Sequence, residues 1–230
     1  MERQMRAAEQ MAAVGELSAA VAHDFRNPIA AIAGSAQLLK NVHIEDSNTD
    51  PANRANRHLT EIILRETGRM EKTITDFLHF ARPADINPEW FDLKKLAEET
   101  VLEIKNRESC PLGATIETDI PDHLDCWADQ QLVQTVLAHL LENSCAAAAK
   151  TGAWPVLVRA QEEQTDDQNC ICIAVIDQGA GIAKNIREMI FTPFFSTKAN
   201  CAGLGLAVVK QTVDQHDGTI NILDTGKAVQ

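Results

Sequence analysis

The sequence predicts an α+β protein in which an antiparallel helical hairpin is followed by an α/β sandwich with a mixed sheet. Two long stretches near the N-terminus carry apolar residues at heptad spacing, which is typical of amphipathic helices. From about residue 89 onward, helical stretches are interleaved with short strand-like stretches. These strands alternate apolar and polar residues, which favours a mixed sheet covered by helices on one face.

Composition limits the class of protein. The chain has 230 residues, of which 45% are hydrophobic, so it can bury a core in one or two domains, and we expect two. A formal net charge of −12 argues against nucleic acid or an anionic membrane as the main partner. We find no apolar run of about 18 residues and no leader peptide, so we expect no membrane segment and a cytoplasmic location. The six cysteines lack CxxC spacing and are expected to be reduced thiols.

The first predicted helix covers residues 1 to about 42. Its seam, which is mostly apolar, contains Met11, Val14, Ser18, Val21, Phe25, Pro28, Ile32, Ser35 and Leu39. His23 lies outside this seam, so its imidazole is expected to face solvent. Pro28 cannot donate to the carbonyl group of Asp24, so we expect the helix to bend one turn after the histidine.

The second predicted helix runs from about 52 to 81, after a polar connector at 43–51 in which Asp50 and Pro51 suit a helix start. Its seam contains Ile63, Met70, Ile74 and Phe77. Two such helices bury only part of their apolar stripes against each other. We therefore expect a homodimer in which two hairpins form a four-helix bundle. The alternative is a single hairpin that packs on the rest of its own chain.

Pro83 is expected to end the second helix, which divides the chain into domains at 1–83 and 84–230. In the second domain we predict helices near 92–107, 130–149 and 204–216, and strands near 115–120, 125–129, 156–161, 170–177 and 219–224.

The run HDFRNP in the first helix combines residues suited to phosphoryl chemistry. His23 and Asn27 are four residues apart and share a helix face, while Asp24 lies beside the imidazole. Asp24 can take the proton of one ring nitrogen and leave the other nitrogen free to attack. The alternative is an ordinary surface histidine on an amphipathic helix.

Four motifs follow in the second domain: HLLENSCAAA, IDQGAGI, FTPFFSTK and AGLGLAVVK. Each alone is weak, because a short glycine motif is often only a tight turn, but their order favours a nucleotide site. Asp177 ends a strand, where its carboxylate can accept a hydrogen bond from an adenine amine. Gly179 and Gly181 allow the backbone to pass close to the base.

The remaining motif residues suit phosphate and metal. Gly203 and Gly205 expose backbone amides at a helix start, where phosphate is favoured. Asn143 offers a carbonyl oxygen to Mg²⁺, which normally keeps waters and substrate phosphate in its shell. Lys198 can reach a terminal phosphate as a point charge.

Taken together, these motifs resemble the cytoplasmic core of a two-component sensor histidine kinase. HDFRNP resembles the H box, HLLENS the N box, DQGAG and AGLGL the two glycine boxes, and FTPFF the F box. FTPFFSTK and FARP are most similar to the nitrogen-regulation and flagellar-type kinases. The resemblance implies a dimerisation and phosphotransfer hairpin, an ATP-binding domain of the gyrase, Hsp90 and histidine kinase superfamily, and a response regulator as partner.

The resemblance also implies residue roles. His23 would attack the γ-phosphate of MgATP, with Asp24 as hydrogen-bond partner or base, and Asn27 would position water for dephosphorylation of the regulator. Asn143 with Mg²⁺, and the amides from Gly203 through Leu204 and Gly205 to Leu206, would stabilise the transferred phosphate. A nucleotide lid would lie between Ile182 and Ala202, anchored by Phe191, Phe194 and Phe195.

Several positions depart from the family pattern. His139 stands where the family has an asparagine, four residues before Asn143, and we expect weakened turnover or an ordinary helix histidine there. Cys201 and Ala202 replace a glycine and a threonine, and Asp217 replaces a glycine in a turn that aspartate tolerates. The family pattern has a further strand after 219–224 that this sequence lacks, so we expect that a neighbour covers the sheet edge or that the sequence is trimmed.

Three functions compete. The leading prediction is an ATP-dependent protein histidine kinase that also acts as a phosphatase toward its response regulator. The second is a catalytically weak or inactive dimeric adaptor that docks a regulator. The third is an ATPase of the same superfamily without phosphohistidine, which leaves HDFRNP unexplained.

Overall fold

The computed structural model describes residues 28–39, 51–81, 86–107, 110–111, 113–164, 169–198 and 201–223. It divides into two compact units. The first comprises Met1–Pro83 and Ser196–Leu204, and the second comprises Ala84–Phe195 and Gly205–Gln230.

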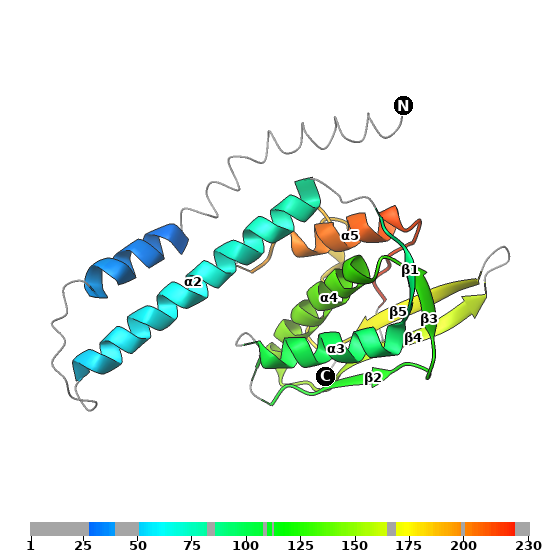
Figure 1. The fold of residues 1–230 in the computed structure, drawn as a ribbon, viewed down its shortest axis with the longest axis horizontal. Helices are drawn as coiled ribbons and strands as arrows, with labels where there is room; N and C mark the ends of the chain where they lie inside the picture. Colours follow the sequence, from blue (N-terminus) through cyan, green and yellow to red (C-terminus); the bar gives the residue numbers. More distant parts are fainter. Residues whose placement is uncertain are drawn as a thin grey trace. The chain divides into compact units, whose positions relative to one another are not determined.

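The first unit contains two described helices (Figure 1). Residues 28–39 are helical, and α2 spans Pro51–Ala81. Pro51 is the first residue of α2, a position where the missing N–H of proline costs nothing. The predicted second helix is therefore confirmed, whereas most of the predicted first helix lies outside the described residues. None of the described helices has the length and apolar character needed to cross a membrane.

The second unit alternates strands and helices (Figure 1). Its strands are β1 (Glu89–Asp92), β2 (Ile116–Asp119), β3 (Asp125–Ala128), β4 (Val156–Gln164) and β5 (Asn169–Ile176). Its helices are α3 (Leu93–Asn106), α4 (Gln130–Thr151), the short 3-10 helix η1 (Lys184–Ile186) and α5 (Gly205–Gln215).

The strands form two sheets. β2, β4 and β5 form one sheet in that order, in which β2 runs parallel to β4 and β5 runs antiparallel to it. β1 and β3 form a separate antiparallel ribbon. The three-stranded sheet is therefore mixed, as the sequence predicts.

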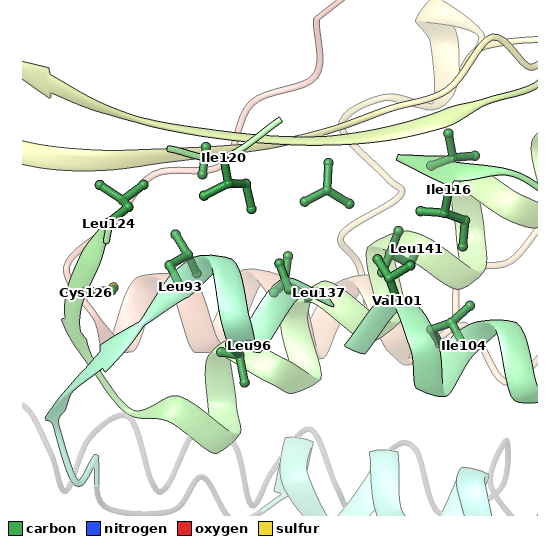
Figure 2. Packing of buried hydrophobic residues seen from close by; sticks show 14 of the residues in the cluster. Leu93, Leu96, Val101, Ile104, Ile116, Ile120, Leu124, Cys126, Leu137 and Leu141 are labelled. Carbon is green, nitrogen blue, oxygen red and sulfur yellow. The ribbon is translucent and has the colours of Figure 1, made fainter. Parts of the chain in front are cut away.

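The core lies between this sheet and the helices. One buried cluster contains Leu93, Leu96, Val101 and Ile104 of α3, Leu137 and Leu141 of α4, and Ile116, Val156 and Val158 of the sheet. Figure 2 shows Leu93, Leu137 and Leu141 between the strands and the helices. On β4, Val156, Val158 and Ala160 are buried while Arg159 between them is exposed. This period-two pattern confirms a sheet with helices on one face.

Capping residues set the helix ends. Asp92 accepts a hydrogen bond from the backbone N–H of Lys95 and starts α3, and Asp129 accepts one from Leu132 and starts α4. Gly152 ends α4 in the left-handed region, with φ of 69°.

Two predictions about the strands need correction. Residues 89–92 form β1, although the sequence interpretation assigned no strand there. Four residues are too short for alternation to be recognised, and pairing with β3 decides the conformation. The predicted strand near 219–224 is wrong for the residues described, because 219–223 are irregular.

Asp217 has φ of 54°, which confirms the predicted turn.

His216 joins α5 to the start of α4. Its Nε2 accepts a hydrogen bond from the backbone N–H of Asp129 at 3.1 Å, and its Nδ1 lies 2.8 Å from the carbonyl oxygen of Thr212. A neutral ring with the proton on Nδ1 satisfies both contacts. The carboxylate of Asp129 also accepts from the backbone N–H of Asn87 at 3.0 Å. Asp129 therefore connects the segment at Asn87 and the start of α4 to His216 at the end of α5.

We expect His216→Ala to lower the free energy of unfolding of this unit by about 1–3 kcal/mol, because it leaves the Asp129 N–H without its acceptor. Urea unfolding followed by tryptophan fluorescence measures this, since Trp90, Trp127 and Trp154 all belong to the second unit. His79→Ala, at an exposed position on α2, is the control. Equal midpoints for the two variants would rule out this role for His216.

Candidate active site

The candidate site is built on one face of α4. His139, Asn143 and Ala147 are spaced four residues apart and form one stripe along the helix. Successive members of such a stripe lie about 6 Å apart along the helix axis. Asn143 is partly buried and occupies the middle of the stripe. Its amide therefore lies between two neighbours that each contact a glycine-containing segment.

The loop after β5 packs on the stripe at Ala147. A Cβ atom added to Gly179 would lie 2.7 Å from the Cβ atom of Ala147 and 3.0 Å from its carbonyl carbon. Glycine is therefore required here by the close approach of the loop to α4. The sequence interpretation assigned this glycine to a close approach to a base, and did not foresee the contact with α4.

The start of α5 packs on the other end of the stripe. A Cβ atom added to Gly205 would lie 3.0 Å from Nδ1 of His139, so the imidazole lies beside the first residue of α5. The side chain of His139 is only 7% exposed. The structure thus buries this histidine against the helix that the second glycine motif begins, and Leu206 is the next residue of that helix.

Asp177 directly follows β5 and shapes the first glycine loop. Its Oδ1 accepts a hydrogen bond from the backbone N–H of Gly179 at 2.9 Å, which fixes a tight turn. Within the described part of the chain, no other hydrogen bond reaches this partly buried carboxylate. Its second oxygen can therefore accept from a ligand. Gly181 has φ of 69° and nothing within 4 Å of an added Cβ atom, so backbone conformation alone requires glycine there.

The segment between the two glycine motifs is divided between the units. Phe191, Phe194 and Phe195 belong to the second unit and are partly buried. Phe194 has φ of 64°, a conformation that a bulky side chain rarely adopts. The segment Ser196–Leu204, with Lys198, Gly203 and Leu204, belongs to the first unit. Gly203 has φ of 69°, and Ser196 Oγ lies 3.1 Å from both the N–H and the carbonyl oxygen of Lys198.

Cys145, a residue of α4 next to the stripe, has a thiol of low reactivity. Burial, together with the nearby Cys110, Glu142 and Asp177, raises the pKa of the Cys145 thiol to about 11. The thiol is therefore neutral near pH 7 and is a poor nucleophile or metal ligand. All six cysteines are free, and among the described residues no three His, Cys, Asp or Glu side chains are grouped to hold a metal ion.

The structure therefore places Gly179 and Gly205 against α4, on either side of Asn143. Asp177 is joined to them through its hydrogen bond with the N–H of Gly179. The predicted phosphotransfer residues His23, Asp24 and Asn27 lie outside the described residues. The contacts made by Ala147 and His139 are the parts of the site that the sequence interpretation missed. Their spacing of four residues on either side of Asn143 is the signal that identifies them.

We expect Gly179→Ala to weaken nucleotide binding at least about tenfold, because the new methyl group collides with Ala147 and displaces the loop, and overpacking typically costs about 1–3 kcal/mol. Isothermal titration with ATP measures the change.

Gly68→Ala is the matched control. Gly68 lies in the middle of α2, and an added Cβ atom there has nothing within 4 Å. Alanine should stabilise the helix by about 1 kcal/mol and leave nucleotide affinity unchanged. If Gly179→Ala bound ATP as tightly as Gly68→Ala, the loop would not form part of the nucleotide site.

Two sequence families match the chain. Residues 13–85 match the His Kinase A (phospho-acceptor) domain, and residues 128–229 match the family described as histidine kinase-, DNA gyrase B- and HSP90-like ATPase.

Curated relatives are similar over nearly the whole chain. Signal transduction histidine-protein kinase AtoS of Escherichia coli strain K12 is 32% identical over 226 residues, which are 96% of this chain and 34% of the relative. Sensor histidine kinase ZraS of Escherichia coli O157:H7 is 31% identical over 96% of this chain and 46% of the relative. Sporulation kinase A of Bacillus subtilis strain 168 is 28% identical over 96% and 34%. The chain spans about a third to a half of the length of these relatives.

Solved structures share the fold. A structure of histidine kinase ThkA in complex with response regulator protein TrrA has a TM-score of 0.67 and 24% identity, covering 94% of this chain and 59% of that one. Histidine kinase AdeS of Acinetobacter baumannii has a TM-score of 0.59 and 21% identity, covering 84% and 86%. At these identities the likeness concerns the fold, and it confirms a helical hairpin followed by an α/β domain with a mixed sheet.

Proposed function

The chain belongs to the two-component histidine kinases, and from this premise we propose that it phosphorylates itself on His23 with ATP and passes the phosphate to a response regulator aspartate. The phospho-acceptor hairpin would be residues 1–83, and the ATP-binding domain residues 84–230. The observation that carries the proposal is the position of Asn143 between the two glycine motifs on one face of α4.

Asn143 of this stripe and the residues of the two glycine motifs would together bind a magnesium nucleotide. The Asn143 amide oxygen is a hard ligand of the kind that Mg²⁺ prefers, and a bound Mg²⁺ would neutralise phosphate charge. The free oxygen of the Asp177 carboxylate would accept the adenine amine. Backbone amides from Gly203 to Leu206 would bind phosphate oxygens at the start of α5. Lys198 would add a positive charge from the lid.

The proposed chemical step needs residues of both domains. The unprotonated ring nitrogen of His23 attacks the γ-phosphorus, an N–P bond forms, the bond to the bridging oxygen breaks and ADP leaves. Asp24 holds the proton of the other ring nitrogen, which keeps the attacking nitrogen unprotonated. The phosphoryl group then passes to the carboxylate of a receiver domain. Asn27 would orient the water molecule that removes phosphate from that regulator.

Two finer assignments belong to the same proposal. FARP and FTPFFSTK support membership of the nitrogen-regulation and flagellar-type subgroup. The six free thiols fit a reducing compartment such as the cytoplasm.

Incubation of the full chain with γ-labelled ATP and Mg²⁺ tests the proposed activity. We expect label on the protein that acid removes and alkali does not, with no label when EDTA is present. Unlabelled protein that still binds a response regulator would favour the adaptor function instead. Release of labelled phosphate without labelled protein would favour a simple ATPase. Either of these two results would overturn the kinase proposal.

Exposed apolar side chains on α2 support a homodimer. Leu64 is 67% exposed and Leu78 is 56% exposed, and the two are 14 residues apart, so they lie on one stripe. Ile74, one turn before Leu78, is 44% exposed. Such a stripe on one chain costs free energy in water, and a second hairpin would cover it.

We expect the combined variant Leu64→Glu and Leu78→Glu to be a monomer, because two charges from each chain would have to be buried in the bundle. Light scattering after size-exclusion chromatography should give about 50 kDa for the wild type, twice the chain mass of 25.2 kDa, and about 25 kDa for the variant. Thr75→Glu, at an exposed polar position of the same helix, should remain a dimer. A monomeric wild type would exclude the four-helix bundle.

A further inference from the structure

The ribbon of β1 and β3 has one buried face and one open face. Phe91 and Cys126 are directly paired, and both are 8% exposed. Because side chains alternate along a strand, the neighbouring pairs project to the opposite face. That outer face carries Trp90 paired with Trp127, and Asp92 paired with Asp125. We call these four residues the ribbon face.

The two tryptophans of the ribbon face are unusually exposed for such large apolar side chains. Trp90 is 69% exposed and Trp127 is 57% exposed. Their ring centroids are 5.4 Å apart and the rings are tilted by 48°, so they form one aromatic surface rather than two isolated contacts. Single exposed apolar residues are normal on a protein surface, but a paired aromatic surface marks an interaction site.

The two aspartates place negative charge beside that surface. Asp92 and Asp125 are directly opposite, and like charges in this arrangement destabilise a sheet. Asp92 accepts a hydrogen bond from the backbone N–H of Lys95. Lys94 lies near Asp92, but its ammonium group forms an ion pair with Asp122 at 2.5 Å. In the described parts of the chain, no basic side chain forms an ion pair with Asp125. A cation from outside the chain would relieve the repulsion.

We propose that the ribbon face docks an arginine side chain of a partner protein. An indole surface attracts a cation placed over its face, and tryptophan does so most strongly. The guanidinium group is planar, so it can stack on an indole while it donates two hydrogen bonds to a carboxylate. Trp90, Trp127 and Asp125 together supply both requirements.

A protein is the occupant that this chemistry favours. Tryptophan and arginine are the side chains most enriched at the centres of protein interfaces, where they supply most of the binding free energy. The charge of the ribbon face complements a basic surface, and the net charge of −12 on the whole chain favours the approach of such a partner. The ribbon face shares no residue with the proposed kinase site, so this docking proposal does not depend on the kinase proposal.

Titration of the isotope-labelled full chain with a capped peptide of sequence GRGRG tests the proposal. The chain has three tryptophans, which give three indole N–H signals in a nitrogen–proton correlation spectrum. We expect the signals of Trp90 and Trp127 to shift saturably. The signal of Trp154, which is partly buried at the edge of the core, should stay in place and serves as an internal reference.

Matched peptides and variants distinguish the arginine site from general effects. GQGQG should cause no saturable shift, and GKGKG should bind more weakly than GRGRG. Asp125→Asn should raise the dissociation constant about threefold or more, and the control Glu117→Gln, exposed on β2, should not. Asp92 is left unchanged because it caps α3.

Four results would overturn the proposal. They are the absence of a saturable shift, an equal response to GQGQG, equal or tighter binding of GKGKG, and an affinity unchanged by Asp125→Asn. Trp90→Leu gives a second check that does not rely on charge, since the Trp127 signal should then shift less. Shifts that follow protein concentration without peptide would assign the ribbon face to self-association instead.

Discussion

Replacement of His23 by alanine is expected to reduce acid-labile phosphate on the protein by more than about a thousandfold, to the background of the assay, because the attacking nitrogen is lost. Nucleotide binding should be unchanged, since the ATP-binding domain is intact. Labelling with γ-labelled ATP followed by filter counting measures the first quantity, and titration calorimetry with ATP measures the second. The pair of measurements separates loss of the acceptor from loss of the nucleotide site.

His58→Ala is the matched control for this variant. His58 is an exposed histidine of α2, 3.9 Å from Glu61, and it has no predicted role in phosphoryl transfer. Its substitution should leave the amount of label unchanged. Retention of label in His23→Ala, or its loss in His58→Ala, would contradict the assignment of the acceptor.

Replacement of Asn143 by alanine is expected to lower the rate of labelling by about two orders of magnitude or more, because the metal and the phosphates lose a ligand at the middle of the α4 stripe. The Mg²⁺ concentration required for half-maximal labelling should rise as well. Initial rates of labelling at several Mg²⁺ concentrations measure both effects. The amount of His23 phosphorylation reached after long incubation should fall less than the rate.

Asn106→Ala provides the comparison for Asn143→Ala, since Asn106 is an exposed asparagine at the end of α3. It should label at the wild-type rate. Tryptophan fluorescence of both variants checks that the second unit is folded. A folded Asn143→Ala protein with wild-type rate and Mg²⁺ dependence would remove Asn143 from the site.

Most helices of this protein could be predicted because local chemistry fixes their ends. Pro51 begins α2, Asp129 caps α4, and Gly152 ends α4 in the left-handed region. The strand β1 could not be predicted, because four residues with one buried side chain carry no usable period. Its conformation depends on β3, which lies more than 30 residues further along the chain.

The sequence predicts the residues of the candidate site but not their contacts. The order of the motifs identified Asn143, Asp177 and Gly179, since each residue type has a chemical reason to be there. The packing of Gly179 on Ala147 depends on tertiary structure, because no local signal states which helix face meets the loop. The same holds for His139, whose burial against Gly205 follows from the packing of α5 on α4. The phosphotransfer residues around His23 stay a prediction.

Identification of the phosphorylated atom tests the central claim most directly. The wild-type chain, incubated with MgATP and kept at alkaline pH, can be examined by phosphorus NMR and by mass spectrometry of its peptides. We predict one phosphoryl group bonded to an imidazole nitrogen of the peptide that contains His23. Phosphate on a serine, threonine or aspartate, or on another histidine, would contradict the proposed mechanism.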